Sequence, residues 1–443
     1  MTSGNAGNLV FRTLYTAALA AGLVVTAPAY AVRAVRRGTG LALAERLGRV
    51  PETAAALRGR RPVWVHAVSV GEVTAAAPLL RAIKTRYPGL SLLVTTVTAT
   101  GRQTVIERVP QADATAYFPL DLPIAINRAL DAVAPGLFLS VETELWPNFL
   151  FALARRGVPA FLVNARLTER SARRYGWGRR LFAPALAGLM GVAAQTAADA
   201  RRLASIGVDA NRIVITGNLK FDQGVDEAEG TPRRAELGLA PDERLWVAGS
   251  THPGEESLLL EAYLRVRREE PRLVLLLAPR HLDRLDKVET LVREAGAEPI
   301  RRSAIAAGNG RAGTGPPVIL LDTLGELASL YGDATVAFVG GTLVPVGGHN
   351  LLEPAARGKP VLFGPHTHKC EEIAQALRDA GGGVQVASGD ALAAHLRRLL
   401  ADDALRGRMG ECGLDMVARN RGAVERTISL LDPWLAELGG ARP

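Results

Sequence analysis

Short, almost wholly apolar runs recur along the chain between longer amphipathic stretches, and this rhythm constrains the fold more than any other feature. In the first half the runs are 63–68, 90–98, 136–141, 160–165 and 213–217. In the second half they are 245–250, 273–279, 318–323, 336–341 and 360–364. Strands that are apolar on both sides are typical of parallel sheets with helices on both faces. The sequence therefore predicts an α/β fold with doubly wound sheets.

The two series of runs are separated by a polar stretch, 222–244, that is rich in charged residues and contains glycine and proline. A chain of 443 residues has room for two domains of ordinary size. We therefore predict a first Rossmann-like domain at 36–225, a linker at 226–240 and a second Rossmann-like domain at 241–443. The C-terminal helix is free to cross back to the first domain, and the two domains are expected to face a cleft.

The composition narrows the classes of partner. Hydrophobic residues make up 48% of the chain and charged residues 22%, as in ordinary folded proteins. A net charge of +9 favours anionic partners such as phosphates, nucleic acid or an anionic membrane surface. Aromatic residues reach only 5%, which argues against a base-stacking surface for single-stranded nucleic acid. The two cysteines, Cys370 and Cys412, exclude a disulfide framework and fit reduced thiols in a cytosolic domain.

Residues 13–32 contain no charged side chain and are just long enough to cross a bilayer as a helix. Three arginines follow within 33–37, against the single Arg12 before the apolar segment. By the positive-inside rule this bias places the body of the protein on the cytoplasmic side of the membrane. We therefore predict an N-terminal membrane-anchor helix within residues 1–35, with the body of the protein facing the cytoplasm.

Two other interpretations of this segment stay open. Ala29-Tyr30-Ala31 resembles a signal-peptidase site, which would export the mature chain, although signal peptides carry their positive charge before the apolar run. The alanine-rich composition and Pro28 also suit a helix that lies on the membrane or packs against the protein core.

Ligands of doubly wound folds bind beyond the carboxyl ends of the strands, so the residues after each apolar run are candidates for chemistry. The first run is followed by Ser69, Gly71 and Glu72. Ser-x-x-Glu is the spacing of a capping box, in which Glu72 would accept a hydrogen bond from the Ser69 amide. Alternatively, Glu72 is a general base beside a glycine that lets backbone approach a substrate.

A second pair of carboxylates, Glu142 and Glu144, follows the run at 136–141. Two residues apart in extended backbone, they would face the same side. They serve either the chemistry of the site or salt bridges to nearby arginines.

The stretch 164–180 carries six arginines against one acid, together with Tyr175 and Trp177. The arginines are Arg166, Arg170, Arg173, Arg174, Arg179 and Arg180. Such a run forms either a solvated face or a surface that grips lipid headgroups or phosphates.

In the second half, Arg280 follows an apolar run and has the forked guanidinium that suits a phosphate or carboxylate. The densest motif is 339–364, where Gly347 and Gly348 would let backbone approach a ligand. Asn350 stands where a helix N-terminus would bind an anion. Together these features predict a nucleotide-phosphate site.

Three potential metal ligands, His366, His368 and Cys370, lie close together, but no second ligand cluster accompanies them, so we predict no metal. The chain has no Walker A motif, and no GxGxxG follows the first run.

Taken in order, the motifs resemble those of one family. They are HAVSVGE, ETELWPN, NARLTERS, GNLKFD, STHPGEE, PRH, DTLGEL and FVGGTLVPVGGHNLLEPAARGKPVLFGPHT. With the N-terminal apolar segment, they are similar to the 3-deoxy-D-manno-octulosonic acid (Kdo) transferases of lipopolysaccharide synthesis. The similarity extends from about residue 14 to about residue 435 without large gaps.

The resemblance implies a GT-B fold, CMP-Kdo as donor and co-substrate with no cofactor, and a lipid A precursor of the lipid IVA type as acceptor. It implies that Glu72 is the catalytic base and that Glu142 and Lys220 stabilise the transition state. The implied CMP contacts are Pro279, Arg280, Leu324, Gly325, Glu326, Asn350, Leu351, Leu352 and Glu353.

The expected reaction is thus an inverting, metal-independent transfer at the cytoplasmic face of the inner membrane, with no nucleic-acid partner. Two alternatives remain: another GT-B enzyme that uses a UDP-sugar, either a transferase or an epimerase, or a non-catalytic sugar-binding module on the membrane surface.

Overall fold

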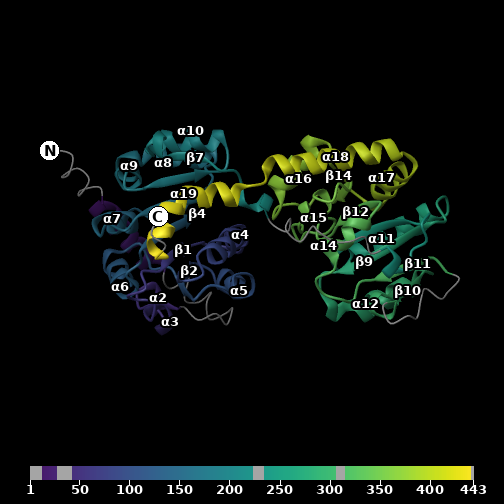
Figure 1. Cartoon of the computed structure of the whole chain (residues 1–443), viewed down its shortest axis with the longest axis horizontal. Coiled ribbons are helices and arrows are strands. Elements are labelled where there is room, and N and C mark those ends of the chain that lie inside the picture. The colour runs from purple at the N-terminus through teal and green to yellow at the C-terminus, as the bar shows by residue number, and fades with distance from the viewer. Residues whose placement is uncertain (1–11, 27–41, 223–233, 306–314, 441–443) are drawn as a thin grey trace. The chain divides into compact units, whose positions relative to one another are not determined.

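The computed structural model of the chain describes residues 12–26, 42–222, 234–305 and 315–440 (Figure 1). They form two compact units, each built on its own sheet. The first unit comprises the described residues of Met1–Asp222 and Arg421–Pro443, and the second those of Gln223–Asn420. The last helix of the chain, α19 (Ala423–Leu438), therefore belongs to the unit formed by the N-terminal half.

The first unit contains a seven-stranded sheet in the order β3-β2-β1-β4-β5-β6-β7, with every neighbouring pair parallel. Its strands are β1 (Val63–His66), β2 (Leu92–Thr96), β3 (Ala114–Tyr117), β4 (Leu137–Val141), β5 (Ala160–Ala165), β6 (Gly191–Ala194) and β7 (Ile213–Ile215). The strand order reverses at β1, which lies between β2 and β4. Ligands of doubly wound sheets bind at such a reversal.

Helices cover both faces of this sheet because its strands are apolar on both sides. Their bounds are α2 (Leu43–Arg46), α3 (Glu52–Ala55), α4 (Val70–Arg86), α5 (Ala99–Arg108), α6 (Pro123–Val133), α7 (Pro147–Arg155), α8 (Glu169–Trp177), α9 (Arg179–Leu186) and α10 (Ala197–Ile206). Alternate residues of each strand enter different cores: Trp64 packs with α6 and α7, and Val65 packs with α4 and α19.

Helix α19 is fastened to the first unit at its N-terminus. The Asp222 carboxylate accepts the amide hydrogens of Gly422, at 2.8 Å, and Val424, at 2.6 Å. Asp222 ends the 3-10 turn η2 (Leu219–Asp222), so this turn and the start of α19 are joined directly. A carboxylate at a helix N-terminus is favourable because it accepts amide hydrogens that have no partner within the helix.

Residues 12–26 are helical, and the first turn of this helix is docked on the first unit. The Tyr15 hydroxyl donates to Asp121 at 2.9 Å, and Arg12 Nε donates to Asn148 at 3.3 Å. Asp121 also accepts the amide hydrogens of Asn148 and Phe149, in the first turn of α7. Among the described residues, no helix has the length and apolar character needed to cross a bilayer. Residues 27–32 of the predicted anchor lie outside the described part.

The second unit repeats the architecture with a seven-stranded parallel sheet in the order β10-β11-β9-β8-β12-β13-β14. Its strands are β8 (Arg244–Thr251), β9 (Leu273–Pro279), β10 (Glu298–Arg301), β11 (Pro317–Leu320), β12 (Val336–Val339), β13 (Val361–Phe363) and β14 (Gly383–Gln385). Here the strand order reverses at β8, between β9 and β12. The prediction of two parallel-sheet α/β units is confirmed.

The helices of the second unit differ widely in length. They are α11 (Glu255–Arg267), α12 (Leu285–Glu294), α13 (Arg302–Ala304), α14 (Leu327–Leu330), α15 (Leu352–Ala355), α16 (Glu371–Ala380), α17 (Gly389–Ala401) and α18 (Asp403–Asn420). Trp246 and Phe338, fully buried on neighbouring strands, pack with α11, α12 and α17 in one core.

Candidate active site

Glu72 lies in the first turn of α4, directly beyond the end of β1. Ser69 is the N-cap of this helix and its hydroxyl donates to Glu72 Oε1 at 3.0 Å. The other carboxylate oxygen accepts the Val68 amide hydrogen at 2.7 Å. The capping contact is therefore present, but the amide that Glu72 binds is that of Val68. The expectation that Glu72 accepts the Ser69 amide hydrogen was wrong: its carboxylate reaches one residue further back along the chain.

The surroundings of Glu72 change its affinity for a proton. Burial raises the pKa of its carboxyl to about 7, and the neighbouring Glu142 carboxylate adds to the rise. Hydrogen bonds from Val68 and Ser69 and the positive charge of Lys220 act in the opposite direction but do not cancel the effect of burial. A base works best when its pKa is near the operating pH, so the environment tunes Glu72 for proton transfer.

Glu142 and Lys220 form an ion pair with 3.8 Å between Glu142 Oε1 and Lys220 Nζ, and both side chains are about three-quarters buried. Glu142 directly follows β4, the neighbour of β1, and Lys220 comes from the η2 turn. The φ of Glu142 is 59°, in the left-handed region that non-glycine residues rarely adopt. The sequence-based expectation of extended backbone was therefore wrong at this residue, and such strain is typical of functional sites.

Glu144 completes a cluster of three carboxylates. Burial raises its pKa to about 7, and the charges of Glu72 and Glu142 contribute further. The cluster arises from the topology: β1 and β4 are adjacent at the reversal of strand order, so the residues that follow them meet at the same edge of the sheet.

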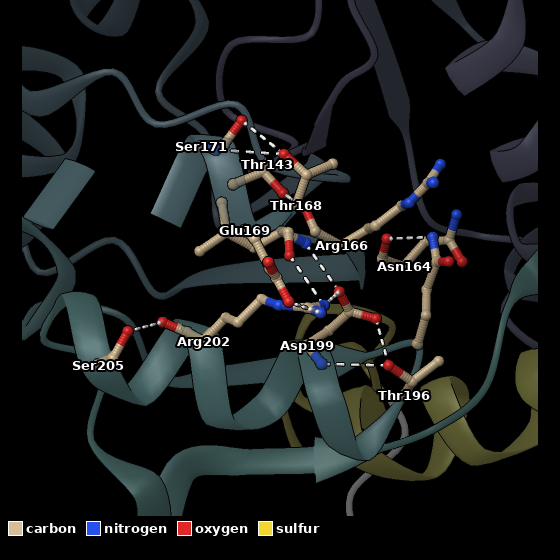
Figure 2. A network of polar contacts seen from close by, with 12 residues as sticks. Thr143, Asn164, Arg166, Thr168, Glu169, Ser171, Thr196, Asp199, Arg202 and Ser205 are labelled. Atoms are coloured by element: carbon tan, nitrogen blue, oxygen red, sulfur yellow. Dashed lines mark hydrogen bonds and ion pairs between the residues drawn. The ribbon is translucent and has the colours of Figure 1, made fainter. Parts of the chain in front are cut away.

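The loop after β5 is held by a polar network that joins it to α10 (Figure 2). Asp199 accepts the Leu167 amide hydrogen at 3.0 Å, and Arg202 lies 3.5 Å from Asp199 and 3.8 Å from Glu169. The Thr143 hydroxyl donates to the Arg166 carbonyl, which links this loop to the residue that follows Glu142.

The arginine-rich stretch lies largely on α8, a helix without a buried residue. Trp177 is 95% exposed. The arginines whose side chains are described are all exposed, namely Arg166, Arg170, Arg173, Arg174 and Arg179, and the side chain of Arg180 lies outside the described part. Both the solvated-face and the anion-binding interpretations stay open.

In the second unit, Glu255 organises the loop at the reversal of strand order. Its carboxylate is fully buried and accepts the amide hydrogens of Gly341, Thr342 and Leu343 at 2.7–3.0 Å, as well as that of His252 at 2.9 Å. A buried carboxylate with four donors holds the loop after β12 against the start of α11. Glu255 belongs to the STHPGEE motif, but its position in the sequence did not predict this role.

His252 and His349 face each other across the same loop. Their Nε2 atoms are 2.8 Å apart, and the rings are stacked with an interplanar angle of 4°. Burial lowers the pKa of His349 to about 4, and the neighbouring His252 and Arg280 lower it further. This pair was not predicted from the sequence. The available signal was that each histidine lies in a glycine-containing turn shortly after an apolar run.

The residues expected to contact the nucleotide differ in their exposure and in their contacts within the protein. Arg280 is exposed at the end of β9, and its amide donates to the Thr251 carbonyl. Glu326 is half-buried and lies 3.3 Å from Arg302. The side chains of Leu351 and Leu352 are fully buried in the protein, so only their backbone atoms are available to a ligand. Leu324, by contrast, is 84% exposed beside Gly325, whose φ is 83°.

The glycine-rich motif is tightly packed within the second unit. A Cβ atom on Gly347 would lie 2.5 Å from His368, and one on Gly348 would lie 2.6 Å from Cys370. Both glycines also have positive φ values, 108° and 86°, so the backbone conformation and the packing each favour glycine, and the approach of a ligand to this backbone stays a prediction. The helix after Asn350 is the four-residue α15, so its dipole is small. Asn350 instead binds within the motif: its side chain caps Leu352 at 3.1 Å and donates to Glu353 at 3.1 Å.

Across the described residues, no group of three or more His, Cys, Asp and Glu side chains is arranged to hold a metal ion. Burial raises the pKa of the Cys370 thiol to about 12, so this cysteine remains a protonated, packed side chain.

Two units, each built on a seven-stranded parallel sheet, have the architecture of the GT-B fold. MurG from Acinetobacter baumannii has a similar structure, with a TM-score of 0.51 at 12% identity over 84% of this chain and 99% of that one. This likeness concerns the fold alone.

Sequence comparisons narrow the class to one family. The family model described as 3-deoxy-D-manno-octulosonic-acid transferase (kdotransferase) matches residues 42–223. The 3-deoxy-D-manno-octulosonic acid transferase of Haemophilus influenzae is 39% identical over 375 residues, and that of Bordetella pertussis is 40% identical over 383. Each match covers 84% of this chain and 87% of the relative. The chain belongs to the Kdo transferase family, the glycosyltransferases of lipopolysaccharide biosynthesis that the sequence motifs resemble.

Proposed function

We propose that this Kdo transferase uses CMP-Kdo as donor and a hydroxyl group of a lipid A precursor of the lipid IVA type as acceptor. The transfer inverts the anomeric configuration and uses neither a metal nor a cofactor. The observation that carries the proposal is Glu72, a carboxylate with a pKa raised to about 7, next to the Glu142–Lys220 ion pair.

In the proposed mechanism, Glu72 takes the proton of the acceptor hydroxyl while the hydroxyl oxygen attacks the anomeric carbon of Kdo. The bond between that carbon and the phosphate oxygen breaks, and CMP leaves with the electron pair. Glu142 and Lys220 stabilise the charges that develop in the transition state. Lys220 also compensates the negative charges of the cluster and keeps Glu72 partly ionised near neutral pH.

We assign the donor nucleotide to the second unit. Pro279 ends β9 and Arg280 follows it, residues 324–326 precede α14, and residues 350–353 span the start of α15. Arg280 is the candidate partner of the CMP phosphate, because a guanidinium binds phosphate oxygens in bidentate fashion. The backbone amide of Leu351 can donate a hydrogen bond to an oxygen of the nucleotide, and the carboxylates of Glu326 and Glu353 can accept hydrogen bonds from its hydroxyl and amino groups.

We assign the protein to the cytoplasmic face of the inner membrane, held there through its N-terminal segment. Leu14, Val24 and Val25 on the helix at 12–26 are exposed apolar side chains. The exposed arginines of α8 and Trp177 are suited to an anionic lipid surface. Fractionation of cells tests this: the protein should stay with inner membranes through a high-salt wash and leave with detergent. Recovery in the soluble fraction would contradict the assignment.

The central test incubates the purified chain with CMP-Kdo and tetraacyl lipid A precursor and counts the products by mass. Wild type should add Kdo and release CMP, and Glu72→Ala should turn over at least about 100-fold more slowly. Near-normal turnover by Glu72→Ala would refute the role of Glu72. A pure sugar-binding module would bind the lipid but release no CMP. A UDP-sugar enzyme would be protected from thermal unfolding by UDP and not by CMP.

A further inference from the structure

Two adjacent strands of the first unit share an unusual backbone feature near their carboxyl ends. Val141 of β4 pairs with Val163 of β5, and the residues that follow them, Glu142 and Asn164, have φ values of 59° and 55°. The pairing of β5 with β6 shifts register between Leu162 and Ala165, so Asn164 lies in a β-bulge. Bulges beside active sites re-aim a side chain, and asparagine tolerates the left-handed conformation that this one needs.

The bulge turns the Asn164 side chain into the protein, where it is fully buried. Its Oδ1 accepts the amide hydrogen of Leu219 at 2.9 Å. Its own carbonyl accepts a hydrogen bond from Gln195 Nε2 at 3.0 Å, which holds the bulge in place. The side-chain orientation is determined, because a reversed amide would set an N–H group against the Leu219 N–H.

Asn164 has two features that lower the stability of the folded protein and that a residue with a purely structural role would not need. Its Nδ2 is buried and has no hydrogen-bond partner among the residues that the structure describes, and its backbone is in a left-handed conformation. Each feature costs stability, and glycine would adopt the same backbone without an unsatisfied amide. What only the asparagine side chain supplies is an acceptor for Leu219.

Leu219 is the residue before Lys220, and the η2 turn that contains both is held at its other end by Asp222 at the start of α19. Glu142, the ion-pair partner of Lys220, is held by the residue that precedes the bulge position Asn164. Its amide donates to the Val163 carbonyl at 2.9 Å. Val163 and Asn164 therefore fix the backbone at or next to both members of the Glu142–Lys220 ion pair.

We propose that Asn164 is a positioning residue for the transfer reaction: through Leu219, its side-chain oxygen holds Lys220 against Glu142. Asn164 does not contact the substrates in this role. The inference rests on the proposed roles of Glu142 and Lys220, so the experiments below separate its failure from theirs.

Three variants of the full chain test the side chain. Asn164→Ala removes the acceptor, and Asn164→Gly removes it while easing the left-handed backbone. Asn164→Asp keeps an acceptor in the same place. We expect kcat to fall about 10-fold or more in the first two, KM for CMP-Kdo to stay within about twofold, and the Asp variant to keep most of the activity. A fully active Asn164→Gly would overturn the proposal, because the backbone conformation alone would then suffice.

The pH profile supplies a readout that a change in overall stability would not move. Lys220 lowers the pKa of Glu72, so a displaced Lys220 lets that pKa rise. The acid limb of the kcat/KM profile should therefore move to higher pH in Asn164→Gly and stay in place in Asn164→Asp. An unmoved limb in the glycine variant contradicts the proposal.

A double-mutant comparison completes the test. If Asn164 acts through Lys220, Asn164→Gly combined with Lys220→Ala should be no slower than Lys220→Ala alone. Multiplied losses would assign Asn164 a separate structural effect and overturn the proposal. Full activity of Lys220→Ala would instead overturn the proposed role of Lys220 itself. Protection of each variant by CMP in thermal unfolding shows that the second unit is intact.

Discussion

The Ser69 hydroxyl lies 3.0 Å from Glu72 Oε1, so the residue that caps α4 also holds the carboxylate proposed as the base. From the sequence, Glu72 could belong to the helix cap or serve as a base. The geometry of the cap is compatible with both roles. The hydrogen bonds from Ser69 and Val68 orient Glu72 and lower its pKa, while burial raises it by more. The carboxyl is thus both fixed in direction and poised near neutrality.

The first prediction concerns the pH dependence of turnover. Glu72 must be ionised to accept a proton, and its pKa is raised to about 7, so kcat/KM should fall as the pH drops below about 7. Glu72→Gln should remove this acid limb together with at least about 99% of the activity. The measurement is a rate profile from pH 5 to 9. A limb that persists in Glu72→Gln would assign the titration to another group.

The second prediction concerns stability. The pKa of Glu144 is raised to about 7, so the folded state favours its protonated form. Its contribution to stability is present below about pH 4.5 and is lost as the pH rises through 7. Glu144→Gln stays neutral and should be more stable than wild type at pH 8, by about 1 kcal/mol after allowance for solvent screening of a half-buried group.

This difference should shrink towards zero near pH 4.5, and thermal unfolding at several pH values measures it. The exposed Glu294→Gln is the matched control and should change stability little at any pH. A Glu144→Gln protein that is less stable than wild type at pH 8 would show that its carboxylate makes a favourable contact instead.

The third prediction concerns the docking of the helix at 12–26. Tyr15→Phe removes one of the donors to the buried Asp121 and should cost about 1 kcal/mol of local stability. Limited proteolysis should then cut within residues 12–26 faster than in wild type. Leu14→Ala, at an exposed position of the same turn, should leave the cleavage rate unchanged. Equal cleavage of Tyr15→Phe and wild type would mean that other contacts hold the helix.

The fourth prediction concerns the loop of the second unit. Glu255→Gln replaces one acceptor oxygen with an NH₂ group, which leaves two of the four amide hydrogens without a partner. The variant should lose about 2–4 kcal/mol of stability and bind CMP at least about 10-fold more weakly. Thermal unfolding and a CMP titration measure the two effects. Glu261→Gln, exposed on the same helix, is the control and should bind CMP normally.

Much of the fold could be predicted from the sequence, because buried parallel strands are apolar on both sides and stand out. Four strands escaped this criterion. In β3 buried and half-buried residues alternate, β6 consists of small residues, β10 at a sheet edge contains Pro299 and charges, and β14 is three residues long. Such strands are recognised by their neighbours in the sheet rather than by their own composition.

For the site, sequence reasoning proposed Glu72, Glu142 and Lys220 from strand ends and family motifs, and the structure brings these three together in the first unit. It did not reveal that Glu255 and the His252–His349 pair organise the second unit, because their partners lie some 90 residues away along the chain. The packing of Gly347 against His368 and of Gly348 against Cys370 was also not predicted from the sequence.

The sequence by itself determined the class of fold, the helix cap at Ser69, the residue types at the strand ends and the family. These depend on properties that can be read along the chain: hydrophobic periodicity, short-range hydrogen bonding and the order of the motifs. Only the tertiary structure decided that Glu72, Glu142 and Glu144 form one cluster with Lys220 and that two of their carboxyls have pKa values near 7. It also decided that Glu142 and Asn164, which follow paired residues of β4 and β5, both have a left-handed backbone conformation. The physical reason is that burial, electrostatic coupling and strand adjacency depend on distances in space, which follow from the order of the strands in the sheet.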